Sequence, residues 1–123
     1  MATIVVVDDE ASVRRVLIRS LRYGGHEVLD FECPEEALEE VDFGEVDLLI
    51  TDLQMPMTGD QVIRQLRARG IQIPVLVVSG FLDPERVAIV ENLGVEKILK
   101  KPFELDELLE AVEESLDVHP AFG

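Results

Sequence analysis

Near the start of the chain lies the stretch Thr3-Ile4-Val5-Val6-Val7-Asp8-Asp9-Glu10. Its first part is apolar and β-branched, and its last part is acidic. A continuous apolar run of this kind is typical of a strand that is buried on both faces, as in a parallel sheet covered by helices. Val46–Ile50 and Val75–Val78 have the same character, and Glu27–Phe31 and Lys97–Leu99 are weaker runs. The sequence therefore predicts five strands.

Segments with helical periodicity separate these strands. The first helix is predicted to hide Val13, Val16, Leu17 and Leu21 and to stop at Gly24-Gly25. Four more helices are expected: from Pro34 to near Val41, through Val62, Ile63 and Leu66 to Gly70, from Asp83-Pro84 to Leu93-Gly94, and along Leu105, Leu108, Leu109, Val112 and Leu116.

This strict alternation predicts an α/β fold, a flavodoxin-like doubly wound (βα)5 domain with a five-stranded parallel sheet. The strand order 2-1-3-4-5 is common for such a sheet, although one sequence does not derive it. We expect a single domain over residues 1–123, with a core of about 3–117 and a loose tail at 118–123.

Composition excludes several classes of function. The chain has 123 residues, 47% of them hydrophobic, and a formal net charge of −15. This acidity argues against direct binding of nucleic acid or anionic lipid. The longest apolar run, residues 73–78, is too short to insert across a membrane, and no secretion signal is recognisable. Cys33 is the only cysteine, so a cytoplasmic location without disulfides is expected.

Polar residues follow four of the predicted strands: Asp8-Asp9-Glu10, Thr51-Asp52, Ser79-Gly80 and Lys100-Lys101-Pro102. In a 2-1-3-4-5 sheet the first and third strands border the ligand crevice, where Asp8, Asp9 and Asp52 would converge. Three carboxylates need a cation, because two like charges about 4 Å apart repel by roughly 4 kcal/mol at an effective dielectric near 20. Hard oxygen ligands favour Mg²⁺, and an aspartate beside Mg²⁺, a lysine and a hydroxyl can accept a phosphoryl group. Each residue taken singly could also be an ordinary loop, turn or cap residue.

These residues also match a known family. The strings Asp8-Asp9, Asp52-Leu53-Gln54-Met55-Pro56-Met57-Thr58-Gly59, Ser79-Gly80 and Lys101-Pro102-Phe103 closely resemble the response-regulator receiver (CheY-like) domain, in order and over about residues 3–117. The resemblance implies that Asp52 is the phosphoacceptor. It further implies that Asp9, Asp52 and the backbone carbonyl of Gln54 hold Mg²⁺, with Asp8 acting through water. Lys101, joined to Pro102 by a cis bond, and Ser79 would contact the phosphoryl group.

The same resemblance indicates three modulating positions. In the family the residues that correspond to Gln54 and Phe81 line the path of the water that hydrolyses the acyl phosphate. Ile98 stands where many members carry Tyr or Phe. We therefore expect an output change that is smaller than an aromatic side chain would give, or one that uses the loop after the fourth strand.

The phosphoryl donor would be a phosphohistidine on a sensor histidine kinase or a histidine phosphotransfer protein; His26 and His119 are not expected to play this role. On the first helix Ile18 is expected to be exposed among Arg14, Arg15, Arg19 and Arg22, which predicts a docking patch for an acidic kinase helix. A solvated basic face is the alternative. The downstream partner is expected to be another, unknown protein.

Two other functions remain open at this point. A small Mg²⁺-dependent phosphohydrolase would want a general acid two residues after the nucleophile, where this chain has Gln54. A pseudo-receiver that only binds partners usually lacks the acceptor or one of the acids. We therefore expect a signalling domain, not an enzyme, that assists its own phosphorylation and dephosphorylation.

Overall fold

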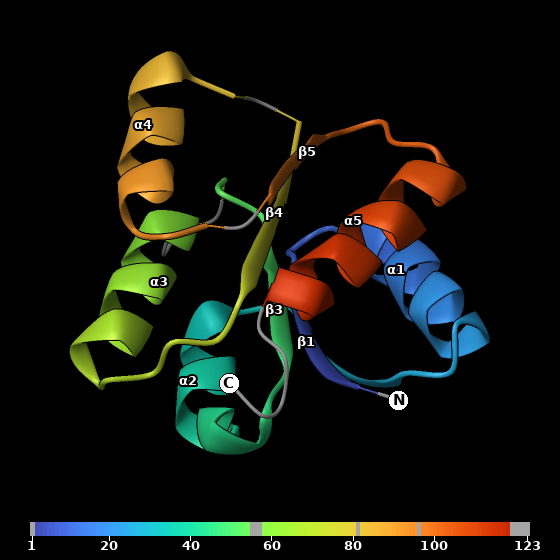
Figure 1. Ribbon diagram of the computed structural model, residues 1–123, viewed down its shortest axis with the longest axis horizontal. Coiled ribbons are helices and arrows are strands. Elements are labelled where there is room, and N and C mark those ends of the chain that lie inside the picture. The colour runs from blue at the N-terminus through green and yellow to red at the C-terminus, as the bar shows by residue number, and fades with distance from the viewer. Residues whose placement is uncertain (1, 55–57, 81, 96, 119–123) are drawn as a thin grey trace.

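Five parallel strands form the centre of the molecule, in the order β2-β1-β3-β4-β5 (Figure 1). The computed structural model describes residues 2–54, 58–80, 82–95 and 97–118. The strands are β1 (Thr3–Val7), β2 (Glu27–Phe31), β3 (Leu48–Thr51), β4 (Val75–Ser79) and β5 (Lys97–Lys100). The predicted fold class and strand order are therefore confirmed.

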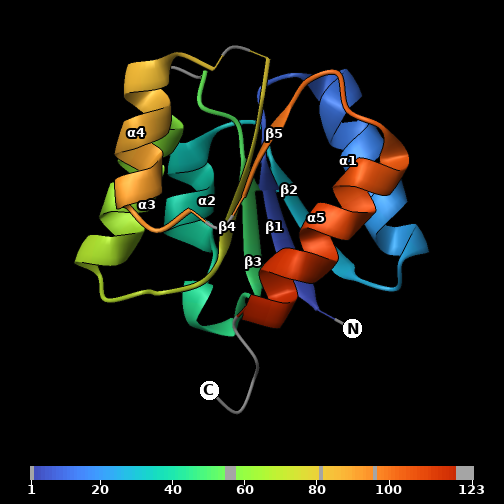
Figure 2. The same cartoon turned by 45° about the horizontal axis from the view of Figure 1, so that its top comes forward.

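Helices cover both faces of this sheet, with α1 and α5 on one face and α2, α3 and α4 on the other (Figures 1 and 2). Their bounds are α1 (Ala11–Tyr23), α2 (Pro34–Glu40), α3 (Gly59–Ala68), α4 (Pro84–Asn92) and α5 (Leu105–Val118), and a short 3-10 helix, η1, spans Phe43–Glu45. No helix in the described part of the chain combines the length and the apolar character that crossing a bilayer requires.

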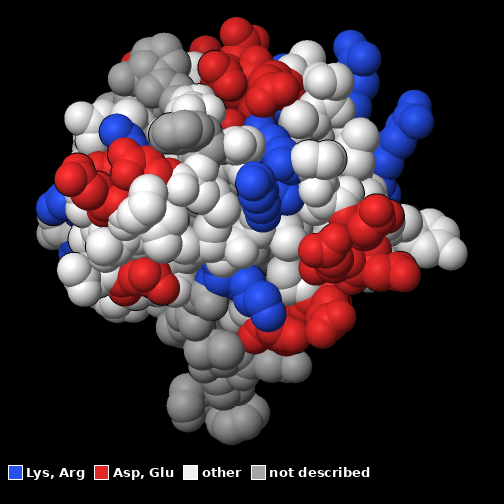
Figure 3. Space-filling view, turned by 90° about the horizontal axis from the view of Figure 1, so that it is seen from above, with Lys and Arg blue, Asp and Glu red and all other residues white. Residues whose placement is uncertain are grey.

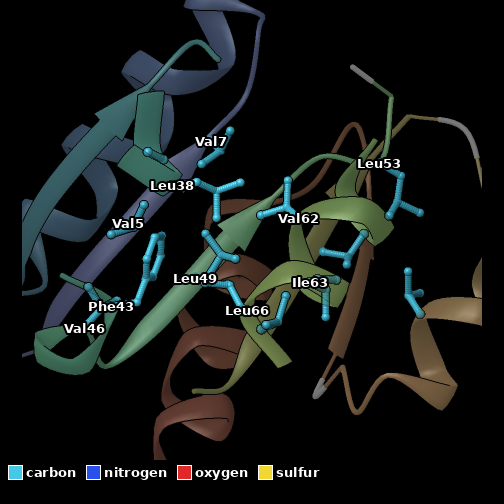
Figure 4. Packing of buried hydrophobic residues seen from close by; sticks show 14 residues of the cluster. Val5, Val7, Leu38, Phe43, Val46, Leu49, Leu53, Val62, Ile63 and Leu66 are labelled. Atoms are coloured by element: carbon cyan, nitrogen blue, oxygen red, sulfur yellow. The ribbon is translucent and has the colours of Figure 1, made fainter. Parts of the chain in front are cut away.

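The sheet has one hydrophobic core on each of its two faces. Along β1, Val5 and Val7 pack into the core beneath α2, α3 and α4, whereas Ile4 and Val6 pack into the core beneath α1 and α5. Figure 4 shows the first of these cores, in which strand residues such as Leu49 face helix residues such as Ile63. Because successive side chains of a strand point to opposite faces, burial of both faces explains the continuous apolar runs in the sequence.

The helix ends agree with the predicted signals. Asp83 precedes α4, and its side chain accepts a hydrogen bond from the backbone N–H of Glu85 at 3.0 Å. Gly25, Gly70 and Gly94 follow α1, α3 and α4 with φ values of 88°, 80° and 84°. Positive φ is strained for residues with a side chain, so these glycines allow the chain to turn out of each helix.

Strand β3 begins later than the sequence predicts. Val46 was expected to open this strand, but the strand starts at Leu48, opposite Ile4 of β1. The preceding helix η1 occupies the approach to the strand, and Val46 is buried in the core just after it. The apolar character of Val46 thus reflects burial at the end of a turn.

Helix α1 corrects one prediction about burial. Leu17 and Leu21 are buried, but Val16 is 50% exposed, so the expectation that Val16 is hidden is wrong. Ile18, expected to be exposed, is half-buried and packs against the α1–α5 core. Since successive residues of an α-helix are about 100° apart, Val16 and Ile18 lie on opposite flanks of the Leu17 side. Neighbouring elements then decide which flank is covered.

Candidate functional site

The side chain of Lys101 joins three carboxylates at one edge of the sheet. Its Nζ lies 2.9 Å from Oδ2 of Asp8, 2.9 Å from Oδ2 of Asp52 and 3.0 Å from Oε1 of Glu10. Asp8 and Asp52 are only 1% and 3% exposed. Two ionisable carboxyl groups therefore share one ammonium in a place that is nearly closed to solvent.

Three strands carry these residues to the same edge. Asp8 and Glu10 follow β1, Asp52 follows β3, and Lys101 follows β5. Strand β4 separates β3 from β5, and the long side chain of Lys101 spans that distance. The backbone N–H of Lys101 donates to the carbonyl of Ser79 at 2.9 Å, which fixes the start of the following loop to the end of β4. The Lys101–Pro102 bond is cis, as the family resemblance implied.

Both buried carboxylates are oriented in the same way. Oδ1 of Asp8 accepts a hydrogen bond from the backbone N–H of Glu10 at 2.9 Å, and Oδ1 of Asp52 accepts one from Gln54 at 3.0 Å. The second oxygen of each side chain faces Lys101. Each carboxylate is thus held by the backbone two residues further along, which leaves its outer oxygen aimed at the shared cation.

Burial and hydrogen bonding oppose each other at this site. Burial raises the pKa of the Asp8 carboxyl above its ordinary value, and the bonds from Glu10 and Lys101 only partly offset this. For Lys101, burial alone would lower the pKa, but the hydrogen bonds to Asp52, Asp8 and Glu10 outweigh it and raise the pKa. The ammonium therefore stays charged at neutral pH.

The charges of the cluster do not balance. Three carboxylates surround one ammonium, so the ionised cluster carries two excess negative charges. Carboxylate oxygens of Asp8, Glu10 and Asp52 lie within 4.8 Å of one another, and they are the one group of possible metal ligands of this kind in the described residues. An all-oxygen donor set with excess negative charge suits a hard divalent cation such as Mg²⁺.

An open hollow adjoins the cluster. It has a volume of about 520 Å³ and lies where α1 approaches the loop after β5. Its lining combines site residues with apolar side chains: Glu10, Ser12, Val13, Val16, Gly80, Lys101, Pro102 and Phe103. A second molecule that entered this hollow would contact the exposed side of Lys101 and Glu10.

Comparison with known families agrees with this geometry. The sequence model of the response regulator receiver domain family matches residues 4–113 of this chain. The chain belongs to the response regulator receiver family. Receiver domains are signalling domains of two-component systems that bind Mg²⁺ at an acidic pocket, and this chain has an acidic cluster of Asp8, Glu10 and Asp52.

Relatives with longer chains share this receiver domain. The chain is 42% identical over 108 residues to the response regulator MprA of Mycobacterium ulcerans, a match that covers 86% of this chain and 46% of MprA. It is 33% identical over 112 residues to the DNA-binding transcriptional regulator NtrC of Escherichia coli strain K12, covering 90% of this chain and 24% of NtrC. The chain spans less than half the length of these relatives.

Solved structures confirm the fold of the receiver domain. The chemotaxis protein CheY4 of Vibrio cholerae has a TM-score of 0.87 and 29% identity, with coverage of 94% of this chain and 99% of CheY4. A CheY-like receiver domain protein of Methanospirillum hungatei has a TM-score of 0.92 and covers 100% of this chain and 99% of its own, at 23% identity. At that identity the second likeness shows the fold alone.

Five of the predicted site residues lie at this edge of the receiver domain. Asp8, Asp52 and Lys101 are in direct contact. Ser79 is fully buried at the end of β4, the strand beside β3. Gln54 is tied to Asp52 through its backbone, and its side chain is exposed.

The structure distributes the acids of the first loop differently from the prediction. Glu10, for which no role is predicted, bonds Lys101, whereas Asp9 is exposed and is absent from the close group of carboxylate oxygens. Asp9 lines a separate small hollow with Glu32 and Cys33. The sequence contained a signal for Glu10, since it directly follows the acidic pair at the strand end, but only the turn after β1 decides which acids point inward.

The predicted basic patch on α1 is only partly free. Nη1 of Arg14 donates to the carbonyl of Asp8 at 2.6 Å, and its Nε lies 3.4 Å from Oδ2 of Asp30. Arg14 therefore braces the site loop and is unavailable as an open docking residue. The other three cations of the patch, Arg15, Arg19 and Arg22, are exposed.

Some predictions concern residues that the structure does not describe. Phe81, Met55-Pro56 and His119 lie outside the described residues.

Ile98 is half-buried and packs against the core beneath α2, α3 and α4. The ring of His26 accepts a hydrogen bond from the N–H of Ala2 at 3.2 Å and lies 3.5 Å from Glu113, away from the Lys101 cluster.

Proposed function

We propose that this receiver domain accepts a phosphoryl group on Asp52 from a phosphohistidine donor and uses the acyl phosphate to switch a protein–protein interaction. One observation carries the proposal: a buried aspartate shares the Lys101 ammonium with a second buried aspartate, and the cluster keeps excess negative charge. A cluster built only for stability would balance its charges, because an uncompensated buried charge is destabilising. This one is suited to a divalent cation and a phosphoryl group.

The chain's own residues supply most of the chemistry. A side-chain oxygen of Asp52 attacks the phosphorus, the bond between phosphorus and the donor imidazole nitrogen breaks, and that nitrogen keeps the electron pair. We propose that Lys101 neutralises charge on the phosphoryl oxygens and that Ser79 donates its hydroxyl to one of them. We propose Asp9, Asp52 and the Gln54 carbonyl as ligands for Mg²⁺, with Asp8 acting through water. Binding through Asp9 requires its side chain to turn inward from the exposed position that it has in this structure. The bound cation would neutralise further negative charge on the transferred group.

Water would later hydrolyse the acyl phosphate. The attack restores Asp52 and releases inorganic phosphate. Gln54 and Phe81 are proposed to set the rate of this step, through orientation and shielding of the water respectively. Ile98 would limit the coupled change at the surface, since it offers no ring that could swing between two positions.

The donor is proposed to be a sensor histidine kinase or a histidine phosphotransfer protein. The hollow beside Lys101 leads to the site and has an apolar floor that includes Val13 and Val16. Arg15, Arg19 and Arg22 lie exposed on the same helix, in a chain with a formal net charge of −15. Acidic side chains elsewhere gather in separate patches with basic side chains between them (Figure 3). An acidic donor helix with an apolar ridge would complement this face.

The remaining expectations follow from this role. We propose one receiver domain over residues 1–123, a cytoplasmic location, and an output through another protein without direct contact to nucleic acid or insertion into a membrane. The phosphohydrolase and the pseudo-receiver are the rival functions. A phosphohydrolase would release phosphate continuously, and a pseudo-receiver would not form an acyl phosphate.

Incubation with acetyl phosphate and Mg²⁺, followed by intact mass measurement, tests the proposal. We expect one added phosphoryl group in the wild type, none in Asp52→Asn, and normal labelling in Asp47→Asn, a control acid at the opposite end of β3. Absence of labelling in the wild type would contradict the proposal. Labelling that survives in Asp52→Asn would place the acceptor elsewhere.

A further inference from the structure

The third partner of Lys101 has no part in the function proposed above. Oε1 of Glu10 lies 3.0 Å from Nζ, and the Glu10 side chain is 56% exposed, against 2% for Asp8 and 4% for Asp52. We propose that Glu10 is a positioning residue that holds Lys101 in the unphosphorylated site and releases it when a phosphoryl group arrives. The inference rests on phosphorylation of Asp52 as proposed above.

The donors of the ammonium group carry the argument. A lysine ammonium has three N–H donors and no acceptor. Its three carboxylate contacts, at 2.9, 3.0 and 2.9 Å, occupy all three donors. A phosphoryl oxygen can bond Lys101 only when one of these carboxylates gives way.

Glu10 is the partner that can leave most easily. Asp8 is enclosed, and its other oxygen is held by a backbone N–H, so a shift of Asp8 would leave a buried carboxylate with fewer bonds. Asp52 is the residue that carries the phosphoryl group. Glu10 has a longer side chain that borders the open hollow, where water can solvate its carboxylate after it leaves Lys101.

The contact and the charge of Glu10 have separate effects. Its contact with Lys101 competes with the phosphoryl oxygen, so it slows phosphorylation. Its negative charge lies close to Asp8 and Asp52, so it strengthens the attraction for a divalent cation. These two effects can be separated because one depends on the reach of the side chain and the other on its charge.

Two variants separate the effect of the contact from the effect of the charge. Glu10→Gln keeps the shape and removes the charge, whereas Glu10→Asp keeps the charge and is one methylene too short for the contact. In Glu10→Gln we expect Mg²⁺ affinity, measured by calorimetric titration, to fall about two- to fivefold, as is usual for a partly exposed charge. With saturating Mg²⁺, Glu10→Asp should be labelled by acetyl phosphate about two- to fivefold faster than the wild type. Glu10→Gln should be labelled at a rate closer to the wild type, because its amide oxygen can still accept a hydrogen bond from Lys101. Glu10→Asp should keep the Mg²⁺ affinity of the wild type.

Glu32→Gln is the matched control. Glu32 is an exposed acid that follows β2 at the same edge of the sheet and lines the other small hollow with Asp9. Its neutralisation changes the net charge equally and should leave labelling and Mg²⁺ affinity within about 1.5-fold of the wild type.

The outcomes separate this inference from the proposed function. Unchanged labelling in Glu10→Asp would overturn the inference while the labelled wild type still supports phosphorylation of Asp52. An equal effect in Glu32→Gln would also overturn it, since net charge would then be the cause. A change in melting temperature alone would reduce Glu10 to a structural residue at the start of α1. An unlabelled wild type would remove the proposed function and this inference with it.

Discussion

Nζ of Lys101 lies 2.9 Å from Oδ2 of Asp52, although the two residues are 49 positions apart in the sequence. The contact crosses from the end of β5 to the end of β3 and passes the end of β4. Since Asp52 is 3% exposed, this ammonium compensates a buried negative charge. The same contact places a cation where the proposed phosphoryl oxygens would lie. Stability and the proposed function therefore involve the same side chain.

Removal of the ammonium should destabilise the fold. In Lys101→Met, Asp8 and Asp52 remain buried without their shared cation, and loss of one partner of a buried ion pair costs about 3–5 kcal/mol. We expect a loss of that order in urea unfolding at pH 7 without Mg²⁺, and a smaller loss with Mg²⁺ present. Lys100→Met, which changes the exposed neighbouring lysine, serves as the control. Equal stability of the two variants would show that Lys101 does not compensate the buried acids.

Neutralisation of Asp8 should have the opposite effect. Burial raises the pKa of Asp8 above 3.8, its value in the unfolded chain. Between these two pKa values the Asp8 carboxyl therefore binds a proton more readily in the folded state than in the unfolded state. The stability that protonation of Asp8 contributes is fully present below pH 3.8 and is lost as the pH rises through the pKa of Asp8 in the folded protein. Asp8→Asn should therefore be more stable than the wild type at pH 7 without Mg²⁺, by roughly 1 kcal/mol.

The pH dependence of that difference is the sharper measurement. The stability gap between Asp8→Asn and the wild type should close as pH falls toward 3.8, because the wild-type carboxyl then becomes neutral as well. Added Mg²⁺ should raise the melting temperature of the wild type more than that of the variant. A gap that widens at low pH would contradict a raised pKa for Asp8.

The core beneath α2, α3 and α4 should be sensitive to cavities. Leu49 is fully buried there, so Leu49→Ala should cost about 2–5 kcal/mol of unfolding free energy. Leu105, which is 50% exposed at the start of α5, gives a matched control, and Leu105→Ala should cost under about 0.5 kcal/mol. Chemical denaturation of both variants measures the difference, and similar costs would contradict the assigned burial.

Docking of the donor can be separated from the chemistry of the site. Val16 borders the hollow and is 50% exposed, whereas Arg19 lies on the basic face of the same helix. Val16→Asp should slow transfer from a phosphohistidine donor about tenfold, which corresponds to about 1.4 kcal/mol at an interface. Labelling by acetyl phosphate, which needs no protein contact, should stay unchanged.

Charge reversal at the exposed arginines of α1 completes this comparison. Arg19→Glu, alone or with Arg15→Glu, should also slow the protein donor and spare acetyl phosphate if both the hollow and the basic face contact the donor. Normal transfer in the arginine variants would leave the hollow alone as the docking surface. Normal transfer in Val16→Asp as well would place docking away from α1.

The sequence alone was enough for the type and order of the regular elements. Apolar runs such as Ile4–Val7 predict strands buried on both faces, and Asp83-Pro84 and Gly94 mark the ends of α4, because these signals depend on local backbone chemistry and on the period of side chains. The predicted strands also placed Asp8, Asp52 and Lys101 at strand ends. Their side chains could be expected to meet once the strands were arranged in one parallel sheet.

Tertiary structure decided what depends on the neighbours of each residue. Val16 and Ile18 have similar character and flank the same helix, yet only packing against α5 and the sheet covers Ile18 and leaves Val16 open. Among the acids that follow β1, the turn directs Asp8 and Glu10 to Lys101 and leaves Asp9 outside. The local sequence pattern indicates which apolar side chains favour burial and which charged side chains favour a partner. Contacts between segments far apart in the chain determine which of these side chains are buried or paired.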